Sequence, residues 1–344
     1  MNIILHGDAK TELSKLADKS VNCLVTSPPY YGLRDYGVEG QIGLEETPEQ
    51  YIQKLVEVFR EAKRVLKDDG TLWVNIGDSY AGGSAKSGSE GEKQKTNKGG
   101  SWGDNDKLAT MKNKLIGYKP KDLIGIPWML AFALRADGWY LRQDIIWSKP
   151  NPMPESVTDR CTKSHEYIFL LSKSAKYYYD ADAIQEVATG FDNRKDQIMK
   201  GSKKYSNGYA PTTTNTQSIA LTGHKRWKFK NLNDKGLPTH TMHENRANGI
   251  TDDIQPIRNK RSVWTVTTKP FKEAHFATFP EELIAPCILA GCPEDGIVCD
   301  PFGGAGTTAL VARKLNRNYI LIELNEKYIK IADKRIYTEI GLFA

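Results

Sequence analysis

Residues 21–30 of this chain read Val-Asn-Cys-Leu-Val-Thr-Ser-Pro-Pro-Tyr. The first six are mostly apolar or β-branched, a pattern typical of a buried strand, and the run ends abruptly at Ser27. Because a proline fixes its own φ angle and keeps the residue before it out of the helical region, Pro28 and Pro29 predict a rigid, extended turn. Open α/β sheets bind ligands beyond the carboxyl ends of their strands. The stretch therefore predicts a ligand-binding turn at the edge of such a sheet.

This turn offers a specific set of polar groups. Pro28 and Pro29 have no backbone N–H, whereas the hydroxyl of Ser27 and the carbonyl of Pro28 can both accept hydrogen bonds. The flat ring of Tyr30 follows directly. These groups suit a planar ring with an exocyclic amine, because the amine can donate two hydrogen bonds while the ring stacks on tyrosine. For four residues alone, a proline-rich loop without function is the alternative.

Strand and helix patterns alternate along most of the chain. Such alternation indicates an α/β protein with a doubly wound, mostly parallel sheet. We expect seven strands, at 2–5, 21–26, 71–76, 140–147, 165–172, 297–299 and 319–324, with 165–172 paired antiparallel to its neighbour. We expect helices at 11–17, 48–66, 123–136, 279–289, 307–315 and 326–337. Thr47 should cap the second helix, and Asp68-Asp69-Gly70 should end it.

Composition excludes several classes of protein. The 344 residues contain no apolar run of about 18 residues, and the N-terminus enters a strand without a secretory signal. We therefore expect a cytoplasmic protein with no membrane contact. The five cysteines lack the paired spacing of a zinc site or a disulfide framework, so no metal site is predicted. Cys23 and Cys287 are expected to be small buried hydrophobes.

The net charge of +6 is unevenly distributed. Residues 84–121 hold nine Lys/Arg against four Asp/Glu, and residues 173–262 hold sixteen against nine. Both segments also have little of the periodicity of packed elements. Concentrated basic charge indicates a polyanionic partner, and basic residues interleaved with aromatics, as at 225–230, suit contacts with phosphates and bases. A solvated lysine-rich loop is the alternative.

A second motif lies near the C-terminus. Residues 300–308 read Asp-Pro-Phe-Gly-Gly-Ala-Gly-Thr-Thr, between a predicted strand and a predicted helix, and Glu323 ends the next strand. Glycines let a backbone approach a ligand at a helix N-terminus, and an acid at that spacing suits a ribose diol. A nicotinamide-dependent dehydrogenase would share these features. However, the glycines do not have the Gly-x-Gly-x-x-Gly spacing, and Asp300 would repel a pyrophosphate.

Together the two motifs resemble those of DNA amino-methyltransferases. The first resembles their catalytic Ser/Asp/Asn-Pro-Pro-Tyr motif, and the second resembles the Asp-Pro-Phe-x-Gly-x-Gly-Thr motif that binds S-adenosyl-L-methionine. The catalytic motif precedes the basic region and the cofactor motif follows it, which is the beta order of this family. In protein-glutamine methyltransferases, which also use a Pro-Pro-Tyr turn, the cofactor motif comes first.

The resemblance implies a circularly permuted, Rossmann-like methyltransferase fold with an inserted target-recognition region. Residues 1–80 and 122–172 would form the catalytic half, and residues 263–344 the cofactor-binding half. Residues 81–121 would be a basic, mobile insertion, and residues 173–262 the target-recognition region. Double-stranded DNA would be the partner, and a companion restriction endonuclease would accompany an enzyme of a restriction–modification system. Such an enzyme would be encoded by a prokaryote, an archaeon or a phage.

The resemblance also assigns roles to individual residues. The catalytic turn would be Ser27, Pro28, Pro29 and Tyr30. The residues implied in cofactor binding are Asp8, Phe279, Pro280, Asp300, Pro301, Phe302, Gly303, Gly304, Gly306, Thr307, Thr308 and Glu323. Among these, Asp300 would hold the methionine ammonium and Glu323 the ribose hydroxyls. The residues expected to contact DNA are Arg34, Lys149, Lys225, Arg226, Trp227 and Lys228.

The reaction implied is direct methyl transfer to an exocyclic amine of a base flipped out of the duplex. Serine at position 27 favours the N4 amine of cytosine, and the N6 amine of adenine is the alternative. Methylation of cytosine C5 would need a nucleophilic cysteine, but Cys287 falls within an apolar helix pattern. A nucleic-acid-binding protein without catalysis and an NAD-dependent enzyme are the alternatives from other classes.

Overall fold

A computed structural model of the chain describes residues 2–82, 117–187, 257–269 and 279–340. The chain forms two compact units, residues 1–184 with 261–344 and residues 185–260. In the second unit, β6 (Glu186–Val187) pairs antiparallel with β7 (Ile257–Arg258). The predicted basic insertion and target-recognition region lie mostly outside the described residues. Everything that follows concerns the first unit.

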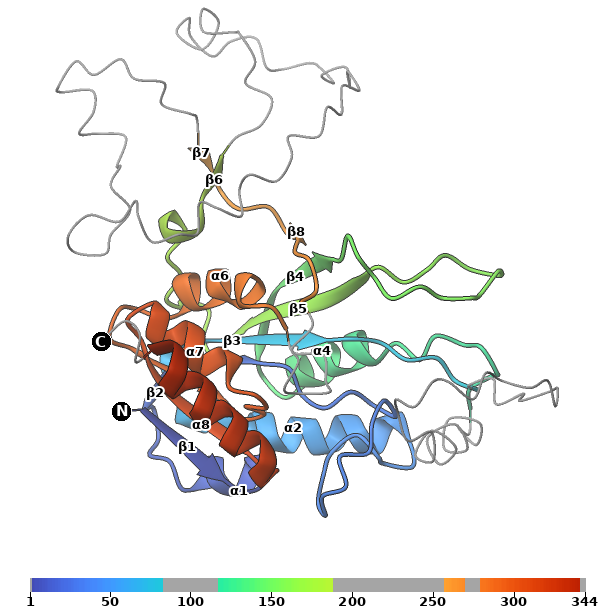
Figure 1. The fold of residues 1–344 in the computed structure, drawn as a ribbon, viewed down its shortest axis with the longest axis horizontal. Helices are drawn as coiled ribbons and strands as arrows, with labels where there is room; N and C mark the ends of the chain where they lie inside the picture. The colour runs from blue at the N-terminus through green and yellow to red at the C-terminus, as the bar shows by residue number, and fades with distance from the viewer. Residues whose placement is uncertain (1, 83–116, 188–256, 270–278, 341–344) are drawn as a thin grey trace, which may run out of the picture. The chain divides into compact units, whose positions relative to one another are not determined.

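An eight-stranded sheet forms the centre of this unit (Figure 1). Its order is β1-β10-β9-β2-β3-β5-β4-β8, and β5 alone runs antiparallel to its neighbours within that sheet. The strands are β1 (Asn2–His6), β2 (Val21–Thr26), β3 (Leu66–Ile76), β4 (Tyr140–Ser148), β5 (His165–Ser172), β8 (Val263–Thr265), β9 (Ile297–Asp300) and β10 (Asn318–Glu323). The doubly wound, mostly parallel sheet and the antiparallel β5 are as predicted.

The predicted number of seven strands was wrong by one. The additional strand, β8, has only three residues and forms one edge of the sheet, where it pairs with β4. Three residues are too few to show a period of two, so the sequence pattern could not reveal this strand.

Helices cover both faces of the sheet, which makes three layers. On one face lie α1 (Ala9–Ser14), α2 (Pro48–Val65) and α4 (Ile126–Ala136), and on the other α6 (Glu281–Gly291), α7 (Thr307–Lys314) and α8 (Glu326–Ile340), while a short 3₁₀ helix spans Asp182–Ile184. Successive strand residues serve the two layers in turn. In β3, Leu72 and Val74 join the core under α2, whereas Trp73 joins the core under α6.

The start of β3 corrects a second expectation. The backbone N–H of Gln50 donates to Thr47 Oγ1 at 3.2 Å, so Thr47 caps α2 as predicted. However, α2 ends at Val65, and Asp68-Asp69-Gly70 lie inside β3 rather than ending the helix. Leu66 is fully buried and pairs with Val21 of β2, so burial in the sheet outweighs its helix propensity.

Strand order brings the two sequence motifs together. The central strands β9 and β2 are adjacent and parallel, with Leu24 beside Cys299. From β2 the sheet continues through β3 in one direction, and from β9 through β10 in the other. Such a switch point leaves a crevice at the carboxyl ends of the two strands, where ligands bind in open α/β sheets. Both motifs begin there.

Candidate active site

A cavity of about 320 Å³ lies at this switch point. Its volume falls in the range of sites for small molecules and cofactors. Two stretches contribute walls to it: one wall is the turn of Ser27, Pro28, Pro29 and Tyr30, and the other is the loop after β9 together with Glu323 at the end of β10. The segment 33–42 supplies a further part of the lining.

The Ser-Pro-Pro-Tyr turn is held from several sides. The Tyr51 hydroxyl donates to the Pro29 carbonyl at 2.8 Å, and the Leu33 N–H donates to the Tyr30 carbonyl at 3.2 Å. The Pro28 carbonyl accepts no hydrogen bond from any described residue, although Pro28 lines the cavity. The predicted acceptor therefore stays available to a ligand.

Tyr30 is fixed in position by its hydroxyl and by its ring. The hydroxyl donates to Glu166 Oε2 at 2.7 Å and approaches Asn75 Oδ1 at 3.3 Å. Burial, and next the negative charge of Glu166, raise the pKa of Tyr30 well above its usual value, so the phenol stays protonated. A Cβ on Gly77 would lie 2.7 Å from Tyr30 Cε2, so only glycine lets the ring lie against the end of β3.

Asp300 joins the two motifs. Its side chain is only 1% exposed, and it accepts hydrogen bonds from the hydroxyls of Thr26 and Thr308, both at 2.6 Å, and from the Phe302 N–H at 3.0 Å. Thr26 directly precedes Ser27. Burial raises the pKa of Asp300 to about 6 in spite of these three donors. The carboxylate thus fixes the loop after β9 (residues 301–306, the predicted cofactor loop) to the Ser-Pro-Pro-Tyr turn, the predicted catalytic turn.

Glu323 lies across the cavity and braces the same loop. Its Oε2 accepts the Gly304 N–H and its Oε1 the Asn325 N–H, both at 2.8 Å. Burial raises its pKa, while these N–H groups act in the opposite direction. A carboxylate has about four lone-pair sites, so these donors leave acceptor capacity on a side chain that lines the cavity.

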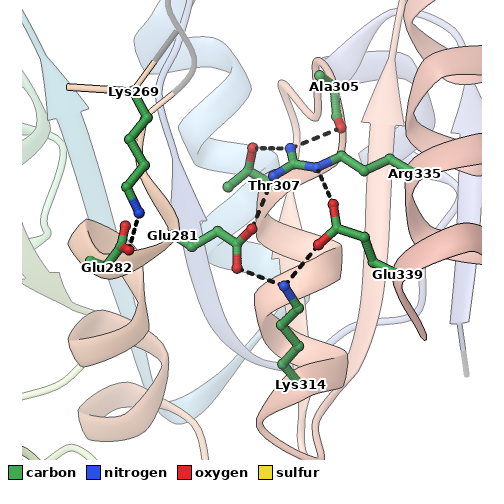
Figure 2. A network of polar contacts seen from close by, with 8 residues as sticks. All are labelled: Lys269, Glu281, Glu282, Ala305, Thr307, Lys314, Arg335 and Glu339. Carbon is green, nitrogen blue, oxygen red and sulfur yellow. Dashed lines mark hydrogen bonds and ion pairs between the residues drawn. The ribbon is translucent and has the colours of Figure 1, made fainter. Parts of the chain in front are cut away.

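A network of ion pairs supports the cofactor loop from behind (Figure 2). Arg335 of α8 donates to Thr307 Oγ1 at 2.8 Å and pairs with Glu281 at 3.2 Å and Glu339 at 3.3 Å. Lys314 pairs with the same two glutamates, at 2.9 Å each. Because Thr307 lines the cavity and Glu281 begins α6 just after Phe279, the network ties together two segments of the predicted cofactor site.

The structure brings most predicted site residues into one place. All four residues of the catalytic turn line the cavity, and so do Asp8, Phe279, Pro301, Phe302, Gly303, Gly304, Thr307 and Glu323. Four others do not line it: Pro280, Asp300, Gly306 and Thr308. Asp8 also caps α1, since its Oδ1 accepts the Thr11 N–H at 2.9 Å. The roles of all these predicted catalytic and cofactor-binding residues toward a ligand stay predictions.

The residues predicted to contact DNA divide into two groups. Arg34 and Lys149 line the cavity. Residues 225–228, which comprise Lys225, Arg226, Trp227 and Lys228, lie outside the described residues. In the part of the chain that is described, no cluster of three metal-ligating side chains occurs, and no helix has the length and apolarity needed to span a membrane.

A profile of the DNA methylase family named N6_N4_Mtase matches residues 21–334. This chain belongs to that family. It is 44% identical over 336 residues to the Type II methyltransferase M.Cfr9I of Citrobacter freundii, an alignment that covers 98% of this chain and 88% of the relative. It is also 42% identical over 341 residues to the Type II methyltransferase M.SmaI of Serratia marcescens, with 97% and 90% covered.

Solved structures share the fold of this DNA methylase. PvuII DNA methyltransferase, described as cytosine-N4-specific, matches with a TM-score of 0.57 at 16% identity and covers 98% of this chain and 92% of its own. The modification methylase TTHA0409 of Thermus thermophilus, solved as a complex with S-adenosyl-L-methionine, matches with a TM-score of 0.53 at 20% identity, with 99% and 96% covered.

Sequence reasoning missed several residues that line the cavity of this DNA methylase. They are Tyr36, Asn75, Trp147, Glu166 and Tyr328. Two of them could have been identified from the sequence. Asn75 interrupts the apolar run of β3, and Glu166 is an acid near the start of the apolar strand β5. A polar residue in a buried strand is informative because it must find a partner.

Proposed function

We propose that this protein transfers a methyl group from S-adenosyl-L-methionine to the N4 amine of a cytosine flipped out of duplex DNA. The observation that carries the proposal is the meeting of the two motifs in one cavity, joined by the 2.6 Å hydrogen bond from Thr26 to Asp300. Family membership makes DNA the substrate class. Serine at position 27 is the feature that favours cytosine.

The residues of the cofactor wall fit S-adenosyl-L-methionine. Glu323 has acceptor capacity for a ribose diol, and the buried Asp300 places negative charge near the loop, which suits a ligand carrying an ammonium and a sulfonium. A Cβ on Gly303 would lie 3.2 Å from Leu321 Cβ, so the loop lies close against β10. When bound, the cofactor supplies an electrophilic methyl group.

The catalytic turn would orient and activate the amine. The lone pair of an aryl amine is delocalised into its ring, so the amine is a poor nucleophile. Hydrogen bonds from the amine to Ser27 and to the open Pro28 carbonyl would localise the lone pair and direct it toward the cofactor wall. Tyr30 would fix the plane of the base by stacking. In such a transfer the new N–C bond would form as the S–C bond breaks, S-adenosyl-L-homocysteine would be the leaving group, and the amine proton would pass to solvent, so no covalent enzyme intermediate would be required.

The test is direct. Purified protein is incubated with S-adenosyl-L-methionine and duplex DNA, and the DNA is digested to nucleosides for mass analysis. We expect N4-methylcytosine. Recovery of N6-methyladenine alone would overturn the cytosine assignment but leave the class intact, and absence of both would overturn the methyltransferase proposal.

A matched variant tests the role of the turn. Ser27→Ala should bind S-adenosyl-L-methionine with unchanged affinity in calorimetry, yet transfer methyl groups at least about tenfold more slowly. Unchanged turnover would contradict the role proposed for Ser27. Because the relatives are Type II methyltransferases by name, we also expect a restriction endonuclease that is blocked by this methylation.

A further inference from the structure

Glu166 lies in the cavity but belongs to neither motif. Its side chain is 15% exposed, and its carboxylate accepts hydrogen bonds from the Tyr30 hydroxyl at 2.7 Å and from Asn75 Nδ2 at 3.2 Å, and pairs with Lys149 through the other oxygen. The antiparallel register of β4 and β5 sets Trp147 opposite Glu166, which brings Lys149 alongside. This carboxylate therefore links the catalytic tyrosine to a lysine from another strand.

Lys149 is anchored on two sides. Its side chain is 18% exposed, and its ammonium lies 4.2 Å from the centroid of the Trp147 ring. That ring is itself fixed, because Trp147 Nε1 donates to the Val266 carbonyl at 2.8 Å. An ammonium has three donors, and among the described residues Glu166 provides its only hydrogen-bond acceptor. Donors therefore remain for a ligand in the cavity that Lys149 lines.

The partly buried ion pair between Lys149 and Glu166 is not expected to be present for the stability of the fold alone. Removing two charges from water carries a penalty that their attraction often fails to repay. Ligand pockets instead use a small number of precisely placed polar or charged groups to fix the orientation of the ligand. Here the ammonium and the Tyr30 hydroxyl share one carboxylate, so a base stacked on Tyr30 would present its edge to Lys149.

We propose that Lys149 is a specificity-determining residue that donates a hydrogen bond to O2 of the flipped cytosine, while Glu166 positions both Lys149 and Tyr30. This inference rests on the proposed function. Beside its amine, the pairing edge of cytosine presents the acceptors N3 and O2, whereas adenine presents N1 and then a C–H group. An adenine seated by its amine on Ser27 and Pro28 would therefore leave the ammonium facing a C–H. Sites with a buried polar group reject ligands that cannot pair with it.

The experiment compares Lys149→Met with wild type and with Lys19→Met. Lys19 also forms an ion pair, with Asp68 at 2.7 Å, but it is well exposed and does not line the cavity. Duplexes carry the recognition sequence, defined beforehand by mapping methylated sites, with either cytosine or adenine at the target position. The readout is kcat/KM for each base, together with the calorimetric dissociation constant for S-adenosyl-L-methionine.

We expect Lys149→Met to lower kcat/KM on cytosine by about 10- to 100-fold, because a hydrogen bond from a charged donor is lost. The ratio of kcat/KM on cytosine to kcat/KM on adenine should fall by a similar factor. Lys19→Met should change neither, and cofactor affinity should change less than about twofold in both. Lys149→Arg keeps a donating cation and should retain the preference for cytosine.

Two results would overturn the inference. If Lys149→Met leaves the cytosine-to-adenine ratio of kcat/KM unchanged, with unchanged salt dependence of DNA binding, Lys149 has a purely structural role. If kcat/KM falls equally on both bases and the salt dependence of DNA binding becomes weaker, Lys149 contacts a phosphate. If Lys149→Met does not fold because Glu166 is left unpaired, the double variant Lys149→Met/Glu166→Gln replaces it, and its cytosine-to-adenine ratio of kcat/KM relative to that of Glu166→Gln alone decides by the same criterion. Wild-type protein that forms no N4-methylcytosine would instead overturn the proposed function itself.

Discussion

Replacement of Asp300 by asparagine should make the protein more stable. The folded environment raises the pKa of this carboxyl from 3.8 to about 6, so its ionised form is disfavoured on folding by about 3 kcal/mol at 1.36 kcal/mol per unit. Asn cannot accept the hydrogen bonds of both Thr26 and Thr308, now 2.6 Å each, and we allow about 1 kcal/mol for that loss. The free energy of unfolding should therefore rise by about 2 kcal/mol at pH 8.

The sign of the pH dependence follows from the raised pKa. The contribution of Asp300 to stability is greatest below its unfolded pKa, is lost as the pH rises through the folded pKa of about 6, and is constant above that. At pH 5 the ionisation cost is about half its value at pH 8. The advantage of Asp300→Asn over wild type should shrink accordingly at pH 5.

The assay is urea denaturation of wild type, Asp300→Asn and Asp295→Asn at pH 8 and pH 5. Asp295 is a suitable control because it is exposed and has a φ of 60°, a conformation that asparagine tolerates. Asp295→Asn should lie within about 0.5 kcal/mol of wild type. A less stable Asp300→Asn at pH 8, or an equal gain at both pH values, would refute the reasoning.

Three further outcomes are expected. Gly77→Ala should slow methyl transfer at least about tenfold in single-turnover assays, because the new Cβ would lie 2.7 Å from Tyr30 Cε2 and would displace the tyrosine ring. Binding of S-adenosyl-L-methionine should be retained, and an unchanged rate of methyl transfer would contradict this packing. Arg335→Met should weaken S-adenosyl-L-methionine binding about tenfold in calorimetry, because Thr307 loses its hydrogen bond to Arg335. Lys330→Met removes an exposed ion pair with Glu326 on the same helix and should leave the affinity unchanged. Equal effects of the two variants would exclude the network of Figure 2 as a support of the loop after β9. Cofactor affinity should rise with pH through about 6 as Asp300 ionises, and calorimetry between pH 5 and pH 8 that finds constant or falling affinity would count against the electrostatic role of this carboxylate.

Much of the site could be predicted because its two walls are continuous in sequence. Ser27 to Tyr30 and Asp300 to Thr308 each combine a strand end with a turn, and proline and glycine restrict or extend the backbone in ways that depend on few neighbours. Strand β2 was predicted with its observed bounds for the same reason, since a buried strand is a continuous apolar run. The start of β3 was not, because the burial of Leu66 against Val21 is a property of the sheet.

The sequence by itself determined the fold class, the two motifs and their order along the chain, since local periodicity and turn chemistry are written in neighbouring residues. Only the tertiary structure decided which distant side chains meet. Thr26 reaches Asp300 because β2 and β9 are adjacent, and Lys149 reaches Glu166 because β4 and β5 pair antiparallel. The physical reason is that strand order and register arise from packing of the whole sheet, and no local pattern encodes them. The Ser-Pro-Pro-Tyr turn could thus be found from sequence, but the carboxylate that holds its tyrosine could not.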